Sequence, residues 1–393
     1  MAALPRIPRA AEDDHAETAV RARRELCEQV AGRPLQHLAG RPVPPGEARG
    51  KVENLVGFAQ VPLGIAGPLR VDTGAGPREV YVPMATTEGA MVASYSRGMK
   101  VLAAAGGARA RVVAEGLSQH PMLVYADAAA AERARAHVAG LRGELERATA
   151  ATTRHGRLVG IEPELLGRRL VLRLVFTTGD AIGINMAARA TEACSELVAR
   201  ATGAVQRYVH GEDVEKRANA RALHGGRGRS VVCDVVVPRA VLAAELRVAP
   251  EDLAAIHASY QLGFARLGTH NGLVQAANGL AAVFLACGQD VAYVTECATG
   301  FLELVPTPAG DLYASAHLPT LLVGTVGGGS GQGTAAECLD LLGVRGAGGA
   351  NVFAAILGAT VLAGDLSLLA TFCTHEFVGA HERLGRNRPA GEP

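Results

Sequence analysis

The sequence predicts a mixed protein of α-helices and β-strands that folds into two or three domains. The chain has 393 residues, which is enough for several domains around a large core. Hydrophobic residues make up 49% of it and charged residues 20%, as in a globular and rather apolar protein. Segments with helical patterning and shorter β-rich segments occur along the chain, and we find no internal repeat.

Up to residue 153, the sequence predicts three helical segments. An amphipathic helix over 15–31 ends before a glycine, and a helix over 87–105 is stopped by two glycines. Between them, a Pro/Gly-rich connection over 41–50 leads to residues 58–69, which prolines and a glycine break up. Residues 127–153 are rich in Ala, Arg and Glu and predict helix with an exposed charged face.

From residue 170 onward, the sequence predicts a mixture of strands and helices. Residues 170–177 alternate and are β-rich, so we expect a strand there, followed by a glycine turn and a helix to about residue 199. A helix over 250–267 has proline in its first turn and acidic residues at its positive end. The other expected elements are a buried strand over 230–238, an apolar helix over 273–287, a hairpin of 301–305 with 312–317, a glycine loop over 325–330 and a long helix from about 350 to 384.

Composition excludes several classes of partner. The net charge is +1, aromatic residues make up 4% and Trp is absent, so neither a nucleic-acid surface nor an anionic-membrane surface is expected. The seven cysteines are scattered without a C-x-x-C pair, which favours reduced thiols and gives no zinc signature. The charged N-terminus does not resemble a signal peptide, and apolar runs such as 279–287 are too short to span a membrane. We expect a cytoplasmic protein with neither metal nor membrane.

The most informative stretch is Pro83–Gly98. It places a carboxylate, Glu88, at the expected start of a helix, directly after two threonines that can cap it. Ser94 and Arg97 follow six and nine residues after Glu88 and are suited to holding an anion. The structural alternative is that Glu88 is an ordinary capping acid, which the positive helix end would keep ionised.

Two glycine-rich turns are candidates for binding phosphate. They cover 179–185 and 324–329, and neither fits the G-x-G-x-x-G pattern of common dinucleotide sites. Glycine turns between strand and helix are mostly structural. However, backbone N–H groups at the start of the helix after 179–185 suit a pyrophosphate.

Four short motifs together resemble the hydroxymethylglutaryl-coenzyme A (HMG-CoA) reductase family, in its class I-like, soluble bacterial-type form. They are Thr-Thr-Glu-Gly around Glu88, Glu-Lys-Arg around Lys216, Gly-Gln-Asp at Asp290 and Gly-Ala-His-Glu at His381. The resemblance covers roughly residues 15 to 387. It implies an α+β fold: a large domain around a long helix, with an inserted small ferredoxin-like domain that binds the cofactor.

The domains implied by the resemblance have approximate bounds. They are a helical N-terminal segment (1–50), the first part of the large domain (51–120), the small NAD(P)H-binding domain (121–209) and the second part of the large domain with the C-terminal helix (210–393). Residues 53–69 are similar to the family's dimer segment, and the family implies a homodimer with active sites at the subunit interface.

The resemblance also implies roles in a double hydride reduction of a thioester. Lys216 would stabilise the oxyanion that each hydride creates, and Glu88 would donate a proton to the aldehyde oxygen. Asp290 would bond Lys216 and titrate with it and Glu88 as a coupled set. His381 would protonate the departing thiolate.

The cofactor implied is NADPH rather than NADH, because Thr153 and Arg154 resemble the pair that holds its 2′-phosphate. Arg154 suits a bidentate phosphate contact. The full set of expected cofactor-binding residues is Thr153, Arg154, Asp180, Ile182, Gly183, Asn185, Val326, Gly327 and Gly328.

Departures from the family concentrate at the expected substrate site. Gln119 stands where the family has an arginine, Gln275 where it has a histidine and Arg217 where it has a second lysine. The expected substrate-binding residues are Ser94, Arg97, Gln119, Glu215, Arg217, Gln275, Asn278 and Ser367. Two interpretations therefore stay open: HMG-CoA reduction to mevalonate, or the same chemistry on another acyl thioester carried by CoA or a carrier protein.

Two other function classes fit these residues less well. A cyclase or lyase on the same scaffold would not need NADPH, and the glycine turn at 179–185 with Arg154 argues against it. A silent binding protein would be expected to lack some of Glu88, Lys216, Asp290 and His381, and all four are present.

Overall fold

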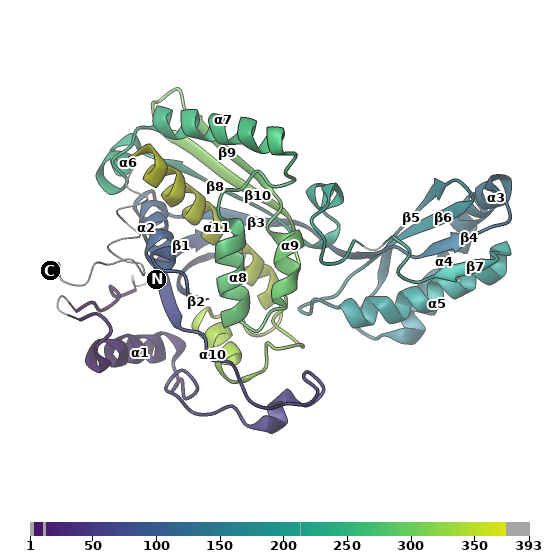
Figure 1. The fold of residues 1–393 in the computed structure, drawn as a ribbon, viewed down its shortest axis with the longest axis horizontal. Helices are drawn as coiled ribbons and strands as arrows, with labels where there is room; N and C mark the ends of the chain where they lie inside the picture. The colour runs from purple at the N-terminus through teal and green to yellow at the C-terminus, as the bar shows by residue number, and fades with distance from the viewer. Residues whose placement is uncertain (1–3, 11–12, 213, 375–393) are drawn as a thin grey trace.

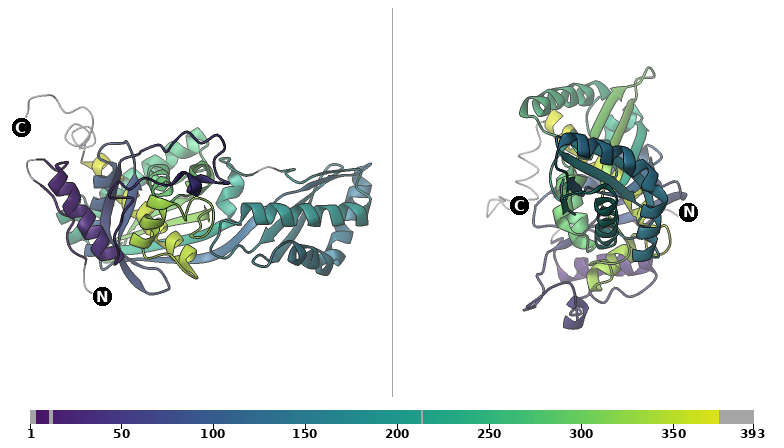
Figure 2. Two further views of the ribbon diagram at one scale, coloured as in Figure 1. Left: turned by 90° about the horizontal axis from the view of Figure 1, so that it is seen from below. Right: turned by 90° about the vertical axis from the view of Figure 1, so that its right-hand side faces the viewer.

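The chain folds into two lobes joined by a narrow neck, as Figures 1 and 2 show. The computed structural model describes residues 4–10, 13–212 and 214–374. The smaller lobe is formed by one internal stretch that contains α3, α4 and α5, and the larger lobe by the segments before and after it. The junction of the lobes is therefore built from parts of the chain that are far apart in sequence.

One ten-stranded sheet runs through both lobes. Its order is β7-β4-β6-β3-β8-β10-β9, with β1 beside β2 and β3, and β5 beside β6. All of these pairs are antiparallel except the short parallel contact of β1 with β3. The strands are β1 Leu63–Asp72, β2 Pro77–Ala85, β3 Ala108–Gln119, β4 Met122–Val124, β5 Leu158–Leu166, β6 Arg169–Phe176, β7 Gln206–Tyr208, β8 Arg227–Val237, β9 Phe301–Pro306 and β10 Leu312–Leu321.

β3 is the strand that links the two lobes. Its residues from Arg109 to Leu117 pair with β8 in the larger lobe. From Leu117 to Gln119 it pairs instead with β6 in the smaller lobe. The C-terminal end of β3 is thereby held at the junction, next to the first residues of β8.

Along the chain, the smaller lobe contains β4, then α3 and α4, then β5 and β6, then α5 and β7. Asp127 begins its first helix, because the Asp127 carboxylate accepts the N–H of Ala130. Alternate leucines of β6, from Leu170 to Leu174, are fully buried, as expected for a strand with one face covered. The helices of this lobe are α3 Ala128–Val138, η2 Ala139–Leu141, α4 Arg142–Thr152 and α5 Ile184–Thr202.

The larger lobe is organised around one long apolar helix, α11 (Gly349–Cys373), which packs against α2, α7, α8 and the sheet. It has 25 residues and a mean hydropathy of 2.0 in its most apolar stretch, so it is long and apolar enough to cross a membrane. However, 94% of that stretch is buried inside the protein, as in the core helix of a globular domain. The expectation that every apolar run is too short to span a bilayer was wrong for this helix.

The other helices of the larger lobe lie around α11 and the sheet (Figure 1). α2 packs between β1 and α11, and α7 lies along β9. These elements are α1 Glu17–Ala31, η1 Pro45–Ala48, α2 Met91–Ala104, η3 Ala220–His224, α6 Arg239–Glu245, α7 Pro250–Leu267, α8 Ala276–Ala286, η4 Val291–Tyr293, α9 Val294–Cys297 and α10 Gly333–Leu341.

Several sequence-based boundaries need correction. Residues 63–69 are part of β1 rather than irregular, because the strand shifts register between Ala66 and Leu69 and so accommodates the proline between them. The helix expected over 87–105 begins only at Met91, and the one expected over 273–287 begins at Ala276. The expected helix from 350 is present to Cys373, and its predicted continuation to 384 lies outside the described residues.

Candidate active site

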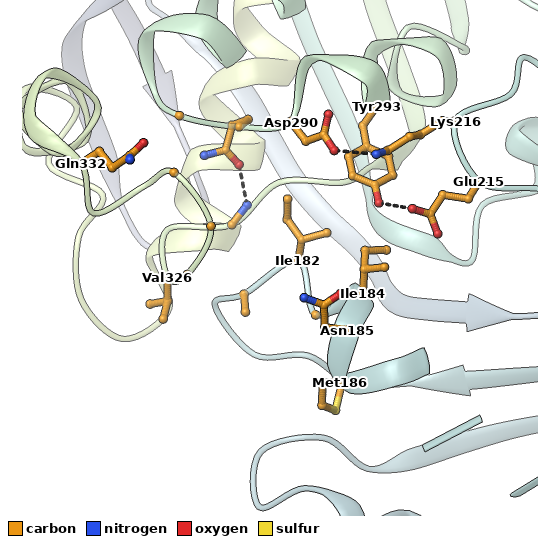
Figure 3. A pocket seen from close by; sticks show the side chains of 18 residues that line it. Ile182, Ile184, Asn185, Met186, Glu215, Lys216, Asp290, Tyr293, Val326 and Gln332 are labelled. Atoms are coloured by element: carbon orange, nitrogen blue, oxygen red, sulfur yellow. Dashed lines mark hydrogen bonds and ion pairs between the residues drawn. The ribbon is translucent and has the colours of Figure 1, made fainter. Parts of the chain in front are cut away.

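A cleft of about 710 Å³ opens at the junction of the two lobes (Figure 3). The start of α5 in the smaller lobe forms one wall, and the glycine loop before α10 faces it. The loop that carries Lys216 and the residues after α8, including Asp290 and Tyr293, close the remaining side. Both predicted glycine turns thus lie on one cleft with two of the predicted catalytic residues.

The two glycine turns are joined through Asp180. Its carboxylate accepts the N–H groups of Gly348 and Ala350, each at 3.0 Å, at the N-terminus of α11. Its backbone carbonyl accepts the N–H groups of Thr325 and Val326 from the other turn. Asp180 therefore fixes the cleft to the core helix, a structural role that the sequence alone did not indicate.

The residues of the cleft fit the phosphate groups of a dinucleotide. Gly183, at the N-cap of α5, has φ of 85°, and a Cβ there would lie 2.4 Å from the Thr178 side chain, so only glycine is accommodated. The first N–H groups of α5 have no partner within the helix. Across the cleft, Gly327 and Gly328 also have positive φ, and no atom lies within 4 Å of where their Cβ atoms would be. Ile182 and Asn185 complete the wall formed by α5.

Thr153 and Arg154 lie at the border of this cleft rather than in its wall. They follow the end of α4, and the Thr153 hydroxyl accepts the N–H groups of His155 and Gly156. Gly156 packs directly against Met186, which does line the cleft. Arg154 is exposed.

Lys216 and Asp290 form the ion pair that the resemblance implies. The Lys216 ammonium lies 2.7 Å from Asp290 Oδ2, and both side chains are partly exposed to the cleft. The hydrogen bond to Asp290 raises the pKa of Lys216, with smaller contributions from Glu215 and Glu296, so the amine remains a cation. Such a fixed cation can stabilise a developing oxyanion.

Three further residues around Lys216 were not singled out as site residues by the sequence. The Tyr293 ring lies under the Lys216 ammonium, 5.0 Å from the ring centroid. Arg227 and Glu296 form a buried ion pair, and Glu296 also accepts the Lys216 N–H. Tyr293 and Glu296 follow Asp290 by three and six residues on η4 and α9, whereas Arg227 comes from the start of β8.

A second polar cluster joins α2, α8 and α11 inside the larger lobe. The Ser94 and Ser367 hydroxyls are 3.1 Å apart, and Arg97 donates to both the hydroxyl and the carbonyl of Ser367. The Gln275 amide donates to the Gly364 carbonyl and lies 3.5 Å from the Ser94 hydroxyl. Four of the predicted substrate-binding residues thus come together in one group.

A buried acid holds this second cluster in place. Asp365 accepts the N–H groups of Val274 and Gln275 at the start of α8, and burial raises its pKa to about 7. It fixes the N-terminal end of α8 against α11. Asn278, in the first turn of the same helix, is exposed.

The two clusters lie at opposite ends of α8. Gln275 is its N-cap, whereas Asp290 follows its C-terminal end. At 1.5 Å per residue, the helix separates its two ends by roughly 18 Å. One chain therefore does not bring all the predicted site residues to a single point.

Glu88 belongs to neither wall of the cleft. It is exposed on the loop between β2 and α2, and its N–H donates to the Thr86 hydroxyl. The N-cap of α2 is Ala90, with φ of 66° and no side-chain cap, so the expected capping of the helix directly after Thr87 was wrong. His381 lies outside the described residues, so its predicted role stays a prediction.

Gln119 is the last residue of β3 and lies near the loop that carries Lys216. Gln119 is 4% exposed, and its Nε2 has no hydrogen-bond partner in the described part of the chain. It lines a small cavity with Glu215 and Arg227, so a buried guanidinium lies beside this neutral amide. Arg217 donates to the Glu215 carbonyl.

Comparison with known proteins gives one consistent result. The family described as hydroxymethylglutaryl-coenzyme A reductase matches residues 19–386. The 3-hydroxy-3-methylglutaryl-coenzyme A reductase of Methanothermobacter thermautotrophicus is 39% identical over 374 residues, covering 94% of each chain. That of Haloferax volcanii is 40% identical over 379 residues, again covering 94% of each.

Solved structures share the fold. A class II 3-hydroxy-3-methylglutaryl-CoA reductase from Streptococcus pneumoniae, bound to NADPH in open conformations, superposes with a TM-score of 0.75. It is 21% identical, and the match covers 92% of this chain and 100% of that one. The likeness shows a common architecture of both lobes.

Proposed function

The chain belongs to the hydroxymethylglutaryl-coenzyme A reductase family, and on this premise we propose that it reduces HMG-CoA to mevalonate with NADPH. The observation that carries the proposal is the cleft in which the Lys216–Asp290 pair lies beside two glycine turns. Hydride transfer to a thioester carbonyl requires a fixed cation for the oxyanion next to a binding site for the dinucleotide. Seven cysteines that form no disulfide agree with a reducing cytoplasm as its location.

The overall reaction balances with two molecules of NADPH and two protons for each HMG-CoA, giving mevalonate, free CoA and two molecules of NADP⁺. NADPH, when bound, supplies the hydride in both reductions. Lys216 stabilises the oxyanion of the hemithioacetal and later that of the alcohol, while Asp290 holds the ammonium in place. Glu88 supplies the proton to the aldehyde oxygen and His381 the proton to the departing thiolate.

The cofactor is held by the turns on both walls of the cleft and by its border. The N–H groups at the start of α5, beside Gly183 and Asn185, bind the pyrophosphate, with Gly327 and Gly328 opposite. Thr153 and Arg154 bind the 2′-phosphate. We assign residues 121–209 as the cofactor-binding domain, residues 1–50 as the N-terminal segment and the remainder as the large domain.

The site is completed by a second copy of the chain. The separation of roughly 18 Å along α8 keeps the Ser94–Ser367 cluster away from Lys216 within one copy. Residues 52–61 carry the exposed apolar side chains Val52, Val56, Phe58 and Val61, as a subunit interface would. A homodimer would bring Glu88 of one copy to Lys216 of the other.

Another acyl thioester, carried by CoA or a carrier protein, is the second candidate substrate. The observation that favours it is the pair of neutral amides, Gln119 and Gln275, at positions where the family has basic side chains. HMG-CoA is preferred because the chain is 39% identical over 94% of its length to a 3-hydroxy-3-methylglutaryl-coenzyme A reductase.

The first prediction concerns cofactor and product. Purified protein is expected to oxidise two molecules of NADPH for each HMG-CoA and to release mevalonate, measured by absorbance and mass spectrometry. Arg154→Ala is expected to weaken NADPH binding about 10- to 100-fold, because it removes a charged hydrogen-bond pair, and to leave NADH binding unchanged. Arg168→Ala, in the β5–β6 turn, is the matched control. Turnover of other acyl thioesters but not of HMG-CoA would favour the second candidate, and absence of saturable NADPH binding would contradict the reductase.

The second prediction concerns the shared site. Glu88→Gln and Lys216→Ala are each expected to be nearly inactive, yet mixed and reassembled subunits should recover about a quarter of wild-type activity. Half of the dimers are then hybrids, and each hybrid contains one site with both residues intact. If the mixture stayed inactive although hybrids formed, Glu88 and Lys216 would have to act from the same chain.

A further inference from the structure

A closed ring of contacts begins and ends on Lys216. Its backbone N–H donates to Glu296, Glu296 pairs with Arg227, and Arg227 lies 4.0 Å from Glu215. Glu215 accepts the hydroxyl of Tyr293, whose ring lies under the Lys216 ammonium. The lysine is therefore held at its backbone and at its charged end by the same network.

The backbone contacts of this network hold Lys216 in an uncommon conformation. Lys216 has φ of 56°, in the left-handed region that residues other than glycine seldom adopt. Its N–H donates to Glu296 Oε1 at 2.7 Å, and the other Glu296 oxygen is 2.6 Å from Arg227 Nε. Glu296 and Arg227 are 1% and 6% exposed, and Arg227 also donates to the Ser118 carbonyl at the end of β3. The turn of Lys216 is thus fixed to the strand that links the lobes.

Tyr293 forms the side-chain part of this network of contacts. Its hydroxyl donates to Glu215 Oε1 at 2.6 Å, which fixes the plane of the ring (Figure 3). The ring face lies 5.0 Å from Lys216 Nζ, a distance at which a cation and an aromatic ring attract each other. Asp290 holds the same ammonium at 2.7 Å. Two fixed groups therefore restrict a side chain that otherwise has many rotamers.

We propose that Tyr293 is a positioning residue for the reduction, holding the Lys216 ammonium where the oxyanion forms. The inference rests on the proposed function, and it concerns a residue that touches the lysine rather than the reacting atoms. Positioning of a charge donor acts on the transition state more than on ground-state binding. Tyr293 should therefore influence kcat while leaving the KM values for NADPH and thioester nearly unchanged.

The decisive comparison is between Tyr293→Phe and Tyr293→Leu, because phenylalanine keeps the ring face and leucine removes it. We expect kcat to fall about 3-fold in Tyr293→Phe and about 10-fold or more in Tyr293→Leu, with both KM values within about twofold of wild type. Tyr313→Phe, on β10, is the matched control and should have wild-type kcat. Equal kcat in wild type and Tyr293→Leu, or a loss that appears in KM alone, would overturn the proposal.

A second readout does not depend on activity. The chain has only three lysines, at positions 51, 100 and 216, so protein labelled with ¹³C-lysine should give three resolvable side-chain ε-CH₂ signals. The Lys216 signal, assigned through Lys216→Arg, is expected upfield of the other two because it lies over an aromatic face. It should move towards them in Tyr293→Leu and remain upfield in Tyr293→Phe. A Lys216 signal that does not respond to Tyr293→Leu would overturn the inference even if the protein is an active reductase, whereas a shifted signal without reductase activity would contradict the proposed function alone.

Discussion

Replacing Lys216 with alanine is expected to lower kcat at least about 10²- to 10³-fold while NADPH binding is retained. The ammonium is the cation that Asp290 fixes in the cleft, and one preorganised donor to an oxyanion typically contributes that factor. The variant also leaves Asp290 with an unpaired charge, which adds to the loss. Single-turnover NADPH oxidation and an NADPH fluorescence titration on the same protein separate the two effects.

The conservative variant Lys216→Arg tests whether charge alone is sufficient. Arginine is abundant in this chain, yet its larger planar guanidinium spreads the charge over three nitrogens and would not place it at the point that the compact Lys216 ammonium occupies between Asp290 and the Tyr293 ring. We therefore expect Lys216→Arg to be nearly as slow as Lys216→Ala. Lys100→Ala, which loses an exposed ion pair with Glu245, is the matched control and should be fully active. Near-normal kcat in Lys216→Ala would remove Lys216 from the chemistry.

How much of the site the sequence could predict depends on how local each part is. Lys216 and Asp290 were found through short motifs, and their ion pair was implied by the family rather than by any spacing. Tyr293, Arg227 and Glu296 could not be found this way, because they meet Lys216 only when the end of β3, the start of β8 and the segment after α8 converge. Such a ring exists only in the folded chain.

The fold likewise divides into elements that local sequence predicts and elements that depend on tertiary contacts. The helix over 250–267 was predicted to the residue because its proline and acids mark the start and a glycine follows its end. β3, in contrast, carries Ala, Arg and Glu, which have low β-propensity, and it is a strand because β6 and β8 pair with it. Glu88 was placed one turn too far into α2, because the left-handed Ala90 delays the helix to Met91.

A second large effect is expected from Gly98→Ala, which should lower the free energy of unfolding by about 3 kcal/mol or more. Gly98 lies on α2 where it crosses α11, and a Cβ at this position would be 1.9 Å from the Ala363 carbonyl oxygen. The added Cβ would clash with a backbone atom, which cannot move aside as the end of a flexible side chain can. Urea denaturation at fixed protein concentration measures the change, since a dimer's apparent stability depends on concentration.

Gly140→Ala is the matched control for this substitution. No atom lies within 4 Å of where its Cβ would be, so the change should be neutral or slightly stabilising through the unfolded chain. Equal urea midpoints for Gly98→Ala and wild type would mean that α2 and α11 can move apart without loss of stability, which would contradict the prediction. That separation would also break the contacts of Ser94 and Arg97 with Ser367, which join the same two helices. The close approach at Gly98 therefore sets both the stability of the core and the geometry of the substrate cluster, so folded Gly98→Ala protein should lose thioester binding more than NADPH binding.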